Sequence, residues 1–443
     1  MGTRRYIDQL ILFEAVRNDE VAGRIAGLLQ GPAGPDPGET APEAFYETQR
    51  LLLGNVGKGE ISGNYLQDHL CRVIAGEDNV FTRMAEAGTF KGLEPGMPAG
   101  EITATLDSEA ESILMLAAGE IGLISPVYRF DFAGYANAPA GSNLAAAPAA
   151  NGGRPSHRER VHTAMTQGSG VDAAILLARY HQSYGSGIFE ASPALNAEER
   201  GLVPVFQTDP IVMGDLIGYE SQKRMLINNA DILLSGMQAN NVLLYGDSGT
   251  GKSSSVKALL NMYAGEGLKM VSVPKDKLSL LPGVLEQIAG RGMKFIVFID
   301  DLSFGENEHE YKIFKSIMEG RITPRPKNTI FIVTTNRRNI VKEVWSDRED
   351  QDDVRRRDNI QEKRSLSDRF GLTLIYTAPD KEEYLAIVRS MAEKSGFSIP
   401  DDELVFEALK WEIRHGGRSG RAARQFVDHM AGIRNIGKGE ISQ

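Results

Sequence analysis

A run of apolar residues leads straight into a glycine-rich turn halfway along this sequence, and few folds accommodate that combination. Residues 241–245 read NVLLY, residues 246–253 read GDSGTGKS, and a helical pattern runs from Ser254 to Tyr263. Glycines at this spacing let the backbone curl so that successive N–H groups point toward one anion at the start of a helix. A strand, a turn and a helix in this order are typical of a phosphate-binding loop in a parallel α/β sheet.

The turn predicts a site for ATP and Mg²⁺. Lys252 should reach the β- and γ-phosphates, and the Ser253 hydroxyl should bind the metal ion. A glycine-rich turn without a ligand is the alternative, which the complete motif in its strand–helix context disfavours. The residues expected to contact the nucleotide here are Gly246, Asp247, Ser248, Gly249, Thr250, Gly251, Lys252, Ser253 and Ser254.

Two carboxylates follow the apolar run KFIVFI, and they are Asp300 and Asp301. Such a run predicts a strand buried on both faces, whose carboxyl end opens at the ligand crevice. We expect Asp300 to hold Mg²⁺ and Asp301 to activate the attacking water. Most ATPases with a phosphate loop of this kind carry glutamate at the position of Asp301. Aspartate is one methylene shorter, and a displacement of about 1 Å can cost roughly 10²-fold in rate. The alternative for Asp301 is a solvated or helix-capping residue.

Composition narrows the class of protein. The formal net charge is -10, so bulk electrostatics do not favour nucleic acid, although a local basic patch stays open. Cys71 is the sole cysteine, which excludes an intramolecular disulfide and a multi-cysteine zinc site and fits a reducing cytoplasm. We find no signal peptide and no run of 18 apolar residues, so we predict no membrane span.

Five segments differ in pattern. The N-terminal part has apolar residues at helical spacing and is followed by an Ala/Gly/Pro-rich stretch. Strand and helix patterns then alternate and predict a parallel sheet of five strands, at Val242–Tyr245, Lys269–Val273, Phe295–Ile299, Thr329–Thr334 and Leu372–Tyr376. The predicted domains are a helical N-terminal domain at 1–133, a flexible linker at 134–157, a helical connector at 158–204, an α/β nucleotide-binding core at 205–380 and a helical lid at 381–443. The N-terminal helices suggest a scaffold or a partner-binding domain.

Further motifs resemble those of the AAA+ ATPases. Asn336 ends a strand that reads TIFIVTTN, as the sensor 1 asparagine does in that family, and the resemblance implies that it orients the attacking water. Arg369, in SLSDRFG, resembles an arginine finger that reaches the ATP site of a neighbouring subunit. A turn asparagine and a surface ion-paired arginine are the respective alternatives.

Two further segments, near the C-terminus and before the phosphate loop, extend the resemblance. Arg418, in HGGRSGR, is similar to the sensor 2 arginine of AAA+ lids, with Arg421 as second candidate and Arg424 on the same helical face; a solvated basic face is the alternative. Ile217, Gly218 and Tyr219 resemble the segment that lines the adenine pocket. The stretches around these motifs also resemble a bacterial AAA+ family labelled as a domain of unknown function.

The resemblance covers roughly residues 205–434 and implies an AAA+ core with a five-stranded parallel sheet and a helical lid, preceded by a mostly α-helical domain. It also implies Mg²⁺-dependent ATP hydrolysis by a homo-oligomer, a hexamer or an open ring, that remodels or loads a protein or nucleic-acid partner. The composition predicts that the protein is cytoplasmic. One alternative is a slow ATP-dependent switch or scaffold whose N-terminal helices bind a partner. A small-molecule kinase fits less well, because it leaves Asn336 and Arg369 unexplained.

Overall fold

Two units divide the chain, and each is described by itself. The computed structural model describes residues 7–29, 48, 50–52, 65–129, 157–167, 170–303, 308–319, 325–336, 369–396, 399–415 and 417–439. The first unit comprises Met1–Ser192 with Gly265–Gly267 and Gly290–Met293, and the second comprises the rest of the chain. The linker expected at 134–157 lies outside the described residues, apart from its last residue.

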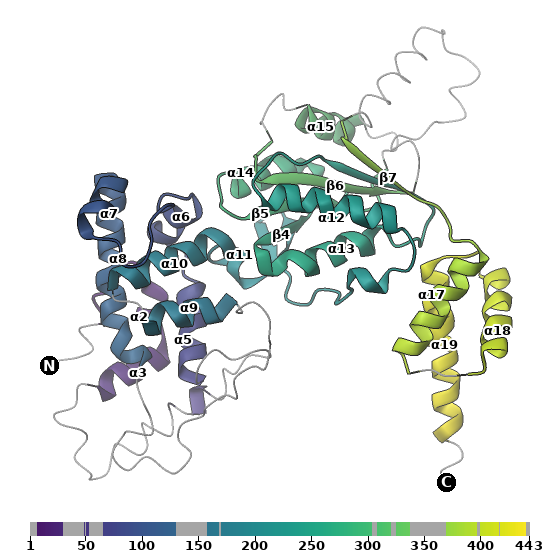
Figure 1. The fold of residues 1–443 in the computed structure, drawn as a ribbon, viewed down its shortest axis with the longest axis horizontal. Coiled ribbons are helices and arrows are strands. Elements are labelled where there is room, and N and C mark those ends of the chain that lie inside the picture. The colour runs from purple at the N-terminus through teal and green to yellow at the C-terminus, as the bar shows by residue number, and fades with distance from the viewer. Residues whose placement is uncertain are drawn as a thin grey trace, which may run out of the picture. The chain divides into compact units, whose positions relative to one another are not determined.

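The N-terminal unit is helical, as its apolar spacing predicts. Helix α10 packs along α6, α8 and α9, and the largest side chains of the core include Phe13, Phe81 and Tyr128 (Figure 1). Its helices are α2 (Glu14–Asn18), α3 (Glu20–Leu28), α5 (Tyr65–Ala75), α6 (Val80–Glu86), α7 (Ala99–Thr105), α8 (Ser108–Tyr128), α9 (His157–Gln167), α10 (Gly170–Tyr184) and α11 (Ile188–Ala191).

Polar caps determine where several of these helices begin. At α6, the Asn79 side chain accepts a hydrogen bond from the backbone N–H of Thr82, whose hydroxyl accepts one from the backbone N–H of Asn79. At α8, Asp107 Oδ1 accepts from Ala110 N at 2.8 Å. Each such cap stabilises a helix by about 1 kcal/mol. The cap at Asn79 fixes the start of α6 after the break that follows α5.

Helix α8 is the one helix, within the described part of the chain, that is long and apolar enough to cross a membrane by length and composition. It carries Glu120, a residue only 3% exposed, whose carboxylate accepts hydrogen bonds from the backbone N–H groups of Ile11, Leu12 and Phe13 at 2.8–3.1 Å. Most of its apolar residues belong to the core of the N-terminal unit, while Met115 and Leu116 are exposed. The structure therefore explains its hydrophobicity by packing within the protein.

A second buried carboxylate, that of Glu77, makes the stability of this unit depend on pH. Burial, together with the nearby carboxylates of Glu14 and Glu120, raises the pKa of Glu77 to about 7, although hydrogen bonds from the backbone N–H groups of Ala15 and Glu14 act in the opposite direction. A carboxyl whose pKa is higher in the folded than in the unfolded chain binds more protons when folded. Its contribution to stability is therefore present at low pH and is lost as the pH rises from about 4.5 to about 7.

We expect Glu77→Gln to reduce the loss of stability that accompanies a rise in pH. Glutamine stays neutral and can still accept from Ala15 N, so the variant should gain about 1–3 kcal/mol of unfolding free energy relative to the wild type between pH 5 and pH 8. Urea denaturation of the full chain at both pH values measures the difference. Glu109→Gln, at an exposed position on α8, is the matched control. A difference between variant and wild type that stays constant with pH would contradict the assignment.

The second unit is built on one sheet with the strand order β2-β1-β4-β5-β6-β3-β7. The sheet has seven strands, so the prediction of five was wrong. The five predicted strands are present and parallel, β1 adds to β4 in parallel, and β2 pairs with β1 in antiparallel. The strands are β1 (Ala194–Glu198), β2 (Gly201–Pro204), β3 (Val242–Gly246), β4 (Leu268–Ser272), β5 (Lys294–Ile299), β6 (Thr329–Thr335) and β7 (Leu372–Tyr376).

The two missed strands lie in the stretch expected to be a helical connector. Their sequence, ALNAEERGLVP, carries few β-branched residues and no long apolar run, so it lacks the usual signal of a strand. Tertiary pairing forms them: Leu195 and Ala197 face the core, while Asn196 and Glu198 alternate toward solvent.

Helices cover both faces of the sheet. Helices α12 (Glu220–Leu234) and α13 (Lys252–Tyr263) pack on one face, against apolar residues of β3, β5, β6 and β7 (Figure 1). Helices α14 (Leu281–Ile288) and α15 (Glu308–Met318) lie on the other face, where the rings of Phe314 and Phe331 meet edge to face. This arrangement leaves the carboxyl ends of the strands uncovered, which is where parallel α/β sheets bind ligands.

Three helices follow the sheet and form the lid, as expected. They are α17 (Lys381–Lys394), α18 (Asp401–Arg414) and α19 (Gly420–Gly439), and they enclose a small apolar core that includes Tyr384, Val388, Ala408 and Phe426. Asp380 starts α17 through a reciprocal capping box with Glu383. The lid therefore has its own core, which is separate from that of the sheet.

Candidate nucleotide-binding site

The glycine-rich turn connects β3 to α13 and takes the backbone conformation that its glycines permit. Gly246, Gly249 and Gly251 have φ values of 143°, 76° and 92°, which residues other than glycine rarely adopt. A Cβ atom at Gly246 would lie 1.9 Å from the carbonyl oxygen of Tyr376. That carbonyl accepts a hydrogen bond from Asp247 N at 2.9 Å, so the turn is fixed to the end of β7.

Lys252 lies at the start of α13 with its side chain folded back over the turn. Its Nζ donates to the carbonyl oxygens of Gly246 and Asp247, at 2.9 and 2.7 Å, and to Asn336 Oδ1 at 2.9 Å. Burial lowers the pKa of Lys252, while the carboxylates of Asp247, Asp300 and Asp301 act in the opposite direction. The ammonium group is therefore held inside the turn, where a phosphate would meet it.

Asp300 follows β5 and accepts hydrogen bonds from two neighbouring elements. Its Oδ1 accepts from the Ser253 hydroxyl of α13 and from the Thr334 hydroxyl of β6, both at 2.5 Å. The structure thus brings together Ser253 and Asp300, the two residues predicted to hold a metal ion. No group of three or more His, Cys, Asp or Glu side chains suited to a metal occurs among the residues described.

Asp301 has a left-handed backbone, with φ at 51°, which is uncommon for a residue other than glycine. Both of its carboxylate oxygens are engaged. Oδ1 accepts from Asn336 Nδ2 at 2.8 Å, and Oδ2 accepts from Lys275 Nζ at 3.1 Å. Asn336 therefore joins Asp301 to Lys252, and one chain of hydrogen bonds links the predicted base to the phosphate loop.

A cavity of about 1060 Å³ contains this cluster and extends to the lid. The lid residues Ile387, Met391 and Val427 give it an apolar part opposite the polar cluster. Most predicted site residues line it: Ile217, Tyr219, Ser248, Gly249, Thr250, Gly251, Lys252, Ser253, Ser254, Asp300, Asp301 and Asn336. Gly246, Asp247, Gly218, Arg369 and Arg418 are not part of its wall.

The predicted adenine segment, Ile217–Tyr219, lies between the sheet and the lid. Ile217 packs against the apolar core of the lid. Tyr219, with φ at 58°, immediately precedes α12. Its ring packs against that of Tyr376, with ring centres 4.7 Å apart and the planes tilted by 32°, and its hydroxyl donates to Thr377 O at 2.6 Å. Burial raises the pKa of Tyr219 to about 12. The buried Lys223 donates to Leu216 O at 2.7 Å, which anchors the same segment from α12.

The lid arginines differ in position. Arg418 Nε donates to Glu412 Oε1 at 2.9 Å at the end of α18. Arg421 and Arg424, on the first turns of α19, line the cavity. The backbone N–H of Arg421 also donates to Gly249 O, which brings the start of α19 to the phosphate loop. The second sequence candidate, Arg421, is therefore nearer to the predicted phosphate position than the first.

Arg369 lies directly before β7, away from the cavity of its own chain. Its guanidinium is half exposed and lies 3.7 Å from a Glu319 carboxylate oxygen. The first four residues of the SLSDRFG motif, Ser365–Asp368, lie outside the described residues. Arg369 is therefore not among the residues that line the candidate site of its own chain.

Sequence reasoning missed three contributors to this site. Thr334 forms hydrogen bonds with both residues of the acidic pair. The sequence pattern that could have revealed it is a polar residue near the end of a mostly apolar strand, two positions before Asn336. Lys275, in the loop after β4, carried no signal, because a lone surface lysine is common. Lys394 of the lid pairs with Asp215 beside the adenine segment, and only the tertiary fold brings these two together.

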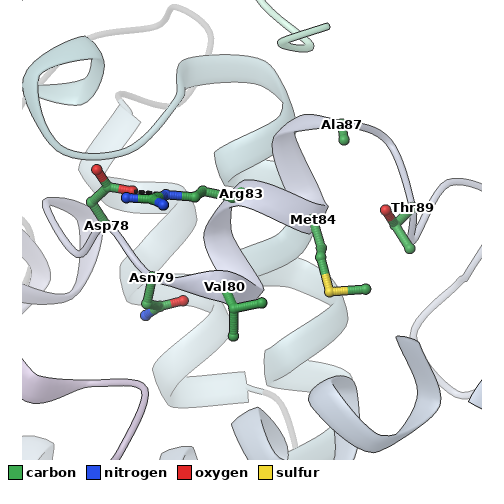
Figure 2. A pocket seen from close by; sticks show the side chains of 7 residues that line it. All are labelled: Asp78, Asn79, Val80, Arg83, Met84, Ala87 and Thr89. Atoms are coloured by element: carbon green, nitrogen blue, oxygen red, sulfur yellow. Dashed lines mark hydrogen bonds and ion pairs between the residues drawn. The ribbon is translucent and has the colours of Figure 1, made fainter. Parts of the chain in front are cut away.

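The N-terminal unit has a smaller hollow of about 410 Å³ beside α6. Figure 2 shows Asp78 and Arg83 turned toward each other there, joined by an ion pair at 2.8 Å, with Val80 and Met84 from the same helix. Its lining has a single carboxylate, that of Asp78, which is paired with Arg83, and it has no cluster of catalytic or metal-binding side chains. The candidate site is therefore the cavity of the second unit.

The geometry determines the class of the protein. In the sheet, β3, which carries the phosphate loop, lies between β6 and β7, and β5, which carries the acidic pair, lies next to β6. The phosphate loop, the acidic pair and Asn336 consequently meet at one edge, and a helical lid borders the same cavity. This is a P-loop α/β protein with the AAA+ fold.

Within that class, the chain belongs to the family described as "Protein of unknown function (DUF815)", whose model matches residues 190–434, more than half of the chain. The chain is also similar to a solved structure of the RuvB Holliday junction branch migration motor of Thermotoga maritima. The identity is 16%, the TM-score is 0.38, and the match covers 52% of this chain and 67% of that one. A point mutant of the same protein matches at 18% identity with a TM-score of 0.39, over 52% and 68% of the two chains.

Proposed function

We propose that this chain binds ATP with Mg²⁺ and hydrolyses it in the cytoplasm, as a subunit of a homo-oligomer, a hexamer or an open ring. Hydrolysis would remodel or load a protein or nucleic-acid partner. The observation that carries the proposal is the hydrogen-bonded cluster of Lys252, Asn336 and Asp301, which shares one cavity with Asp300 and the phosphate loop. Phosphoryl transfer needs this combination of a cation, a metal-holding carboxylate and groups that orient water.

The residues present fit Mg²⁺. Ser253 and Asp300 offer hard oxygen atoms held 2.5 Å apart, and Mg²⁺ prefers one or two such protein ligands together with phosphate oxygens and water. When bound, the ion would neutralise charge on the phosphates. Asp300 and Ser253 would hold it, and their contact with each other would then give way to contacts with the ion and its water.

The remaining residues would position the water and stabilise charge. Lys252 donates to Asn336 in the structure, and a γ-phosphate would compete for that donor. Asn336 would then be able to orient the water, with Asp301 accepting its proton. Arg421 would contact the phosphates from the lid, with Arg418 as the alternative, and Arg369 would do so from a neighbouring subunit.

Replacing Asp301 tests the assignment of the base. We expect Asp301→Asn to lower ATP turnover about 10²-fold or more, because the amide cannot accept a proton, while ATP affinity changes little. Phosphate release and the binding of a fluorescent ATP analogue measure the two effects. Asp402→Asn, at an exposed position on α18, is the control. Unchanged turnover in Asp301→Asn would contradict the role of Asp301 as the base. If Asp301→Asn binds ATP without cleaving it, the same variant can be used to capture a partner.

A slow ATP-dependent switch or scaffold, with the N-terminal helices as its partner-binding module, is the second candidate. The observation in its favour is that both oxygens of Asp301 are engaged, by Asn336 and Lys275, in a side chain shorter than glutamate. Asp301→Glu separates the two proposals. An increase in turnover of more than about 10-fold favours the switch, because it would show that the wild-type Asp301 side chain is too short to reach the attacking water. Brisk wild-type turnover that a partner stimulates favours the motor or loader.

A further inference from the structure

Thr334 forms a hydrogen bond with each of the three residues that directly follow β5. Its hydroxyl donates to Asp300 Oδ1 at 2.5 Å and accepts from the backbone N–H of Asp301 at 2.8 Å. Its carbonyl oxygen accepts from the backbone N–H of Leu302 at 2.8 Å. The side chain is buried, with 2% of the residue exposed. One residue of β6 thus organises three consecutive residues at the end of β5.

The hydroxyl is placed so that both of its hydrogen-bonding functions are used. As donor, it fixes one oxygen of Asp300, the same oxygen that the Ser253 hydroxyl contacts. As acceptor, it pairs the N–H of Asp301, whose backbone has the left-handed φ of 51°. That conformation costs roughly 1–2 kcal/mol for a residue with a side chain, so it needs a partner that holds it. The Thr334 hydroxyl is that partner.

We infer that Thr334 is the positioning residue of this site, which sets the orientation of Asp300 toward the metal ion and of Asp301 toward the attacking water. The inference rests on the proposed ATPase function. Thr334 acts through the two aspartates. Because both depend on one hydroxyl, its loss should impair metal use and turnover together.

Valine and serine substitutions separate the hydroxyl from the shape of the side chain. Thr334→Val keeps the volume but removes the donor and the acceptor, and it leaves the carbonyl bond to Leu302 intact. Thr334→Ser restores the hydroxyl. The control is Thr329→Val, at the amino end of the same strand, where the residue is also buried.

We expect Thr334→Val to lower kcat by about 10- to 100-fold, because a displacement of roughly 1 Å in a catalytic group has effects of that size. The KM for ATP should change less than about 3-fold. The Mg²⁺ concentration that gives half-maximal binding of a fluorescent ATP analogue should rise at least about 3-fold. Thr334→Ser should restore all three quantities to within about 3-fold of the wild type, and Thr329→Val should leave them unchanged.

The outcomes distinguish this inference from the proposed function. If turnover depends on Lys252 but Thr334→Val matches the wild type in kcat and Mg²⁺ requirement, the inference is overturned and the ATPase stands. If the chain does not hydrolyse ATP, the proposed function fails, and the Mg²⁺ requirement of analogue binding still decides the role of Thr334. If Thr334→Val does not fold, as its thermal unfolding would reveal, Thr334→Ala compared with Thr334→Ser gives the same decision.

Discussion

Replacing Lys252 with alanine should weaken ATP binding by about 10²-fold and reduce turnover further still. The ammonium group lies inside the phosphate loop, where it contacts two loop carbonyls and Asn336. A charged hydrogen bond contributes about 1.5–3 kcal/mol, and a triphosphate would make more than one with this group. The loss in turnover should exceed the loss in affinity, because charge on the phosphates develops in the transition state.

Titration with a fluorescent ATP analogue and a phosphate-release assay measure the two losses. Lys257→Ala is the matched control, since this lysine lies on the same helix, is half exposed and pairs with Asp209. It should retain affinity and turnover. Affinity in Lys252→Ala that equals that of the control would show that the glycine-rich turn is not a triphosphate site, and the proposed function would then fail at its first step.

Replacing Arg369 with alanine should lower turnover by about 10³-fold and leave ATP affinity nearly unchanged. An arginine supplied to a neighbour's phosphates stabilises the transition state with effects of roughly 10³- to 10⁵-fold. In the structure Arg369 does not line the cavity of its own chain and lies next to Glu319, so we expect ATP binding not to require it. Arg389→Ala is the control, because this arginine is also surface-exposed and paired, with Asp401.

A mixture of two inactive variants tests whether Arg369 acts in trans. Arg369→Ala subunits keep the phosphate loop, and Lys252→Ala subunits keep the arginine. If neighbours share a site, mixed oligomers should regain part of the wild-type turnover. Failure to regain activity, with mixed assembly verified, would place Arg369 outside the catalytic site or confine its action to its own chain.

The motifs predicted much of the fold because each combines a local pattern with a required context. The apolar run before Gly246, the run before Asp300 and the run before Asn336 all form the expected parallel strands. Parallel strands buried on both faces produce continuous apolar runs, which are readable in a sequence. Strands β1 and β2 were missed because they lie toward the edge of the sheet and owe their form to pairing with their neighbours.

The same contrast holds within the site. Lys252, Ser253, Asp300, Asp301 and Asn336 could be predicted because their positions follow from strand ends and helix starts. The position of Arg421 relative to Arg418 depends on where α19 begins, and a shift of three residues along a helix changes which side chain meets the cavity. The contacts that Lys275 and Lys394 make join segments far apart in the sequence, with no local pattern to reveal them.

Phosphate release from ATP, measured per subunit over a wide range of protein concentration, tests the central proposal most directly. We expect turnover that requires Mg²⁺, rises with protein concentration as subunits assemble, and yields ADP and inorganic phosphate. Turnover that stays constant down to a verified monomer would contradict a site shared between neighbours. Phosphate found on another molecule would contradict hydrolysis and indicate a kinase instead.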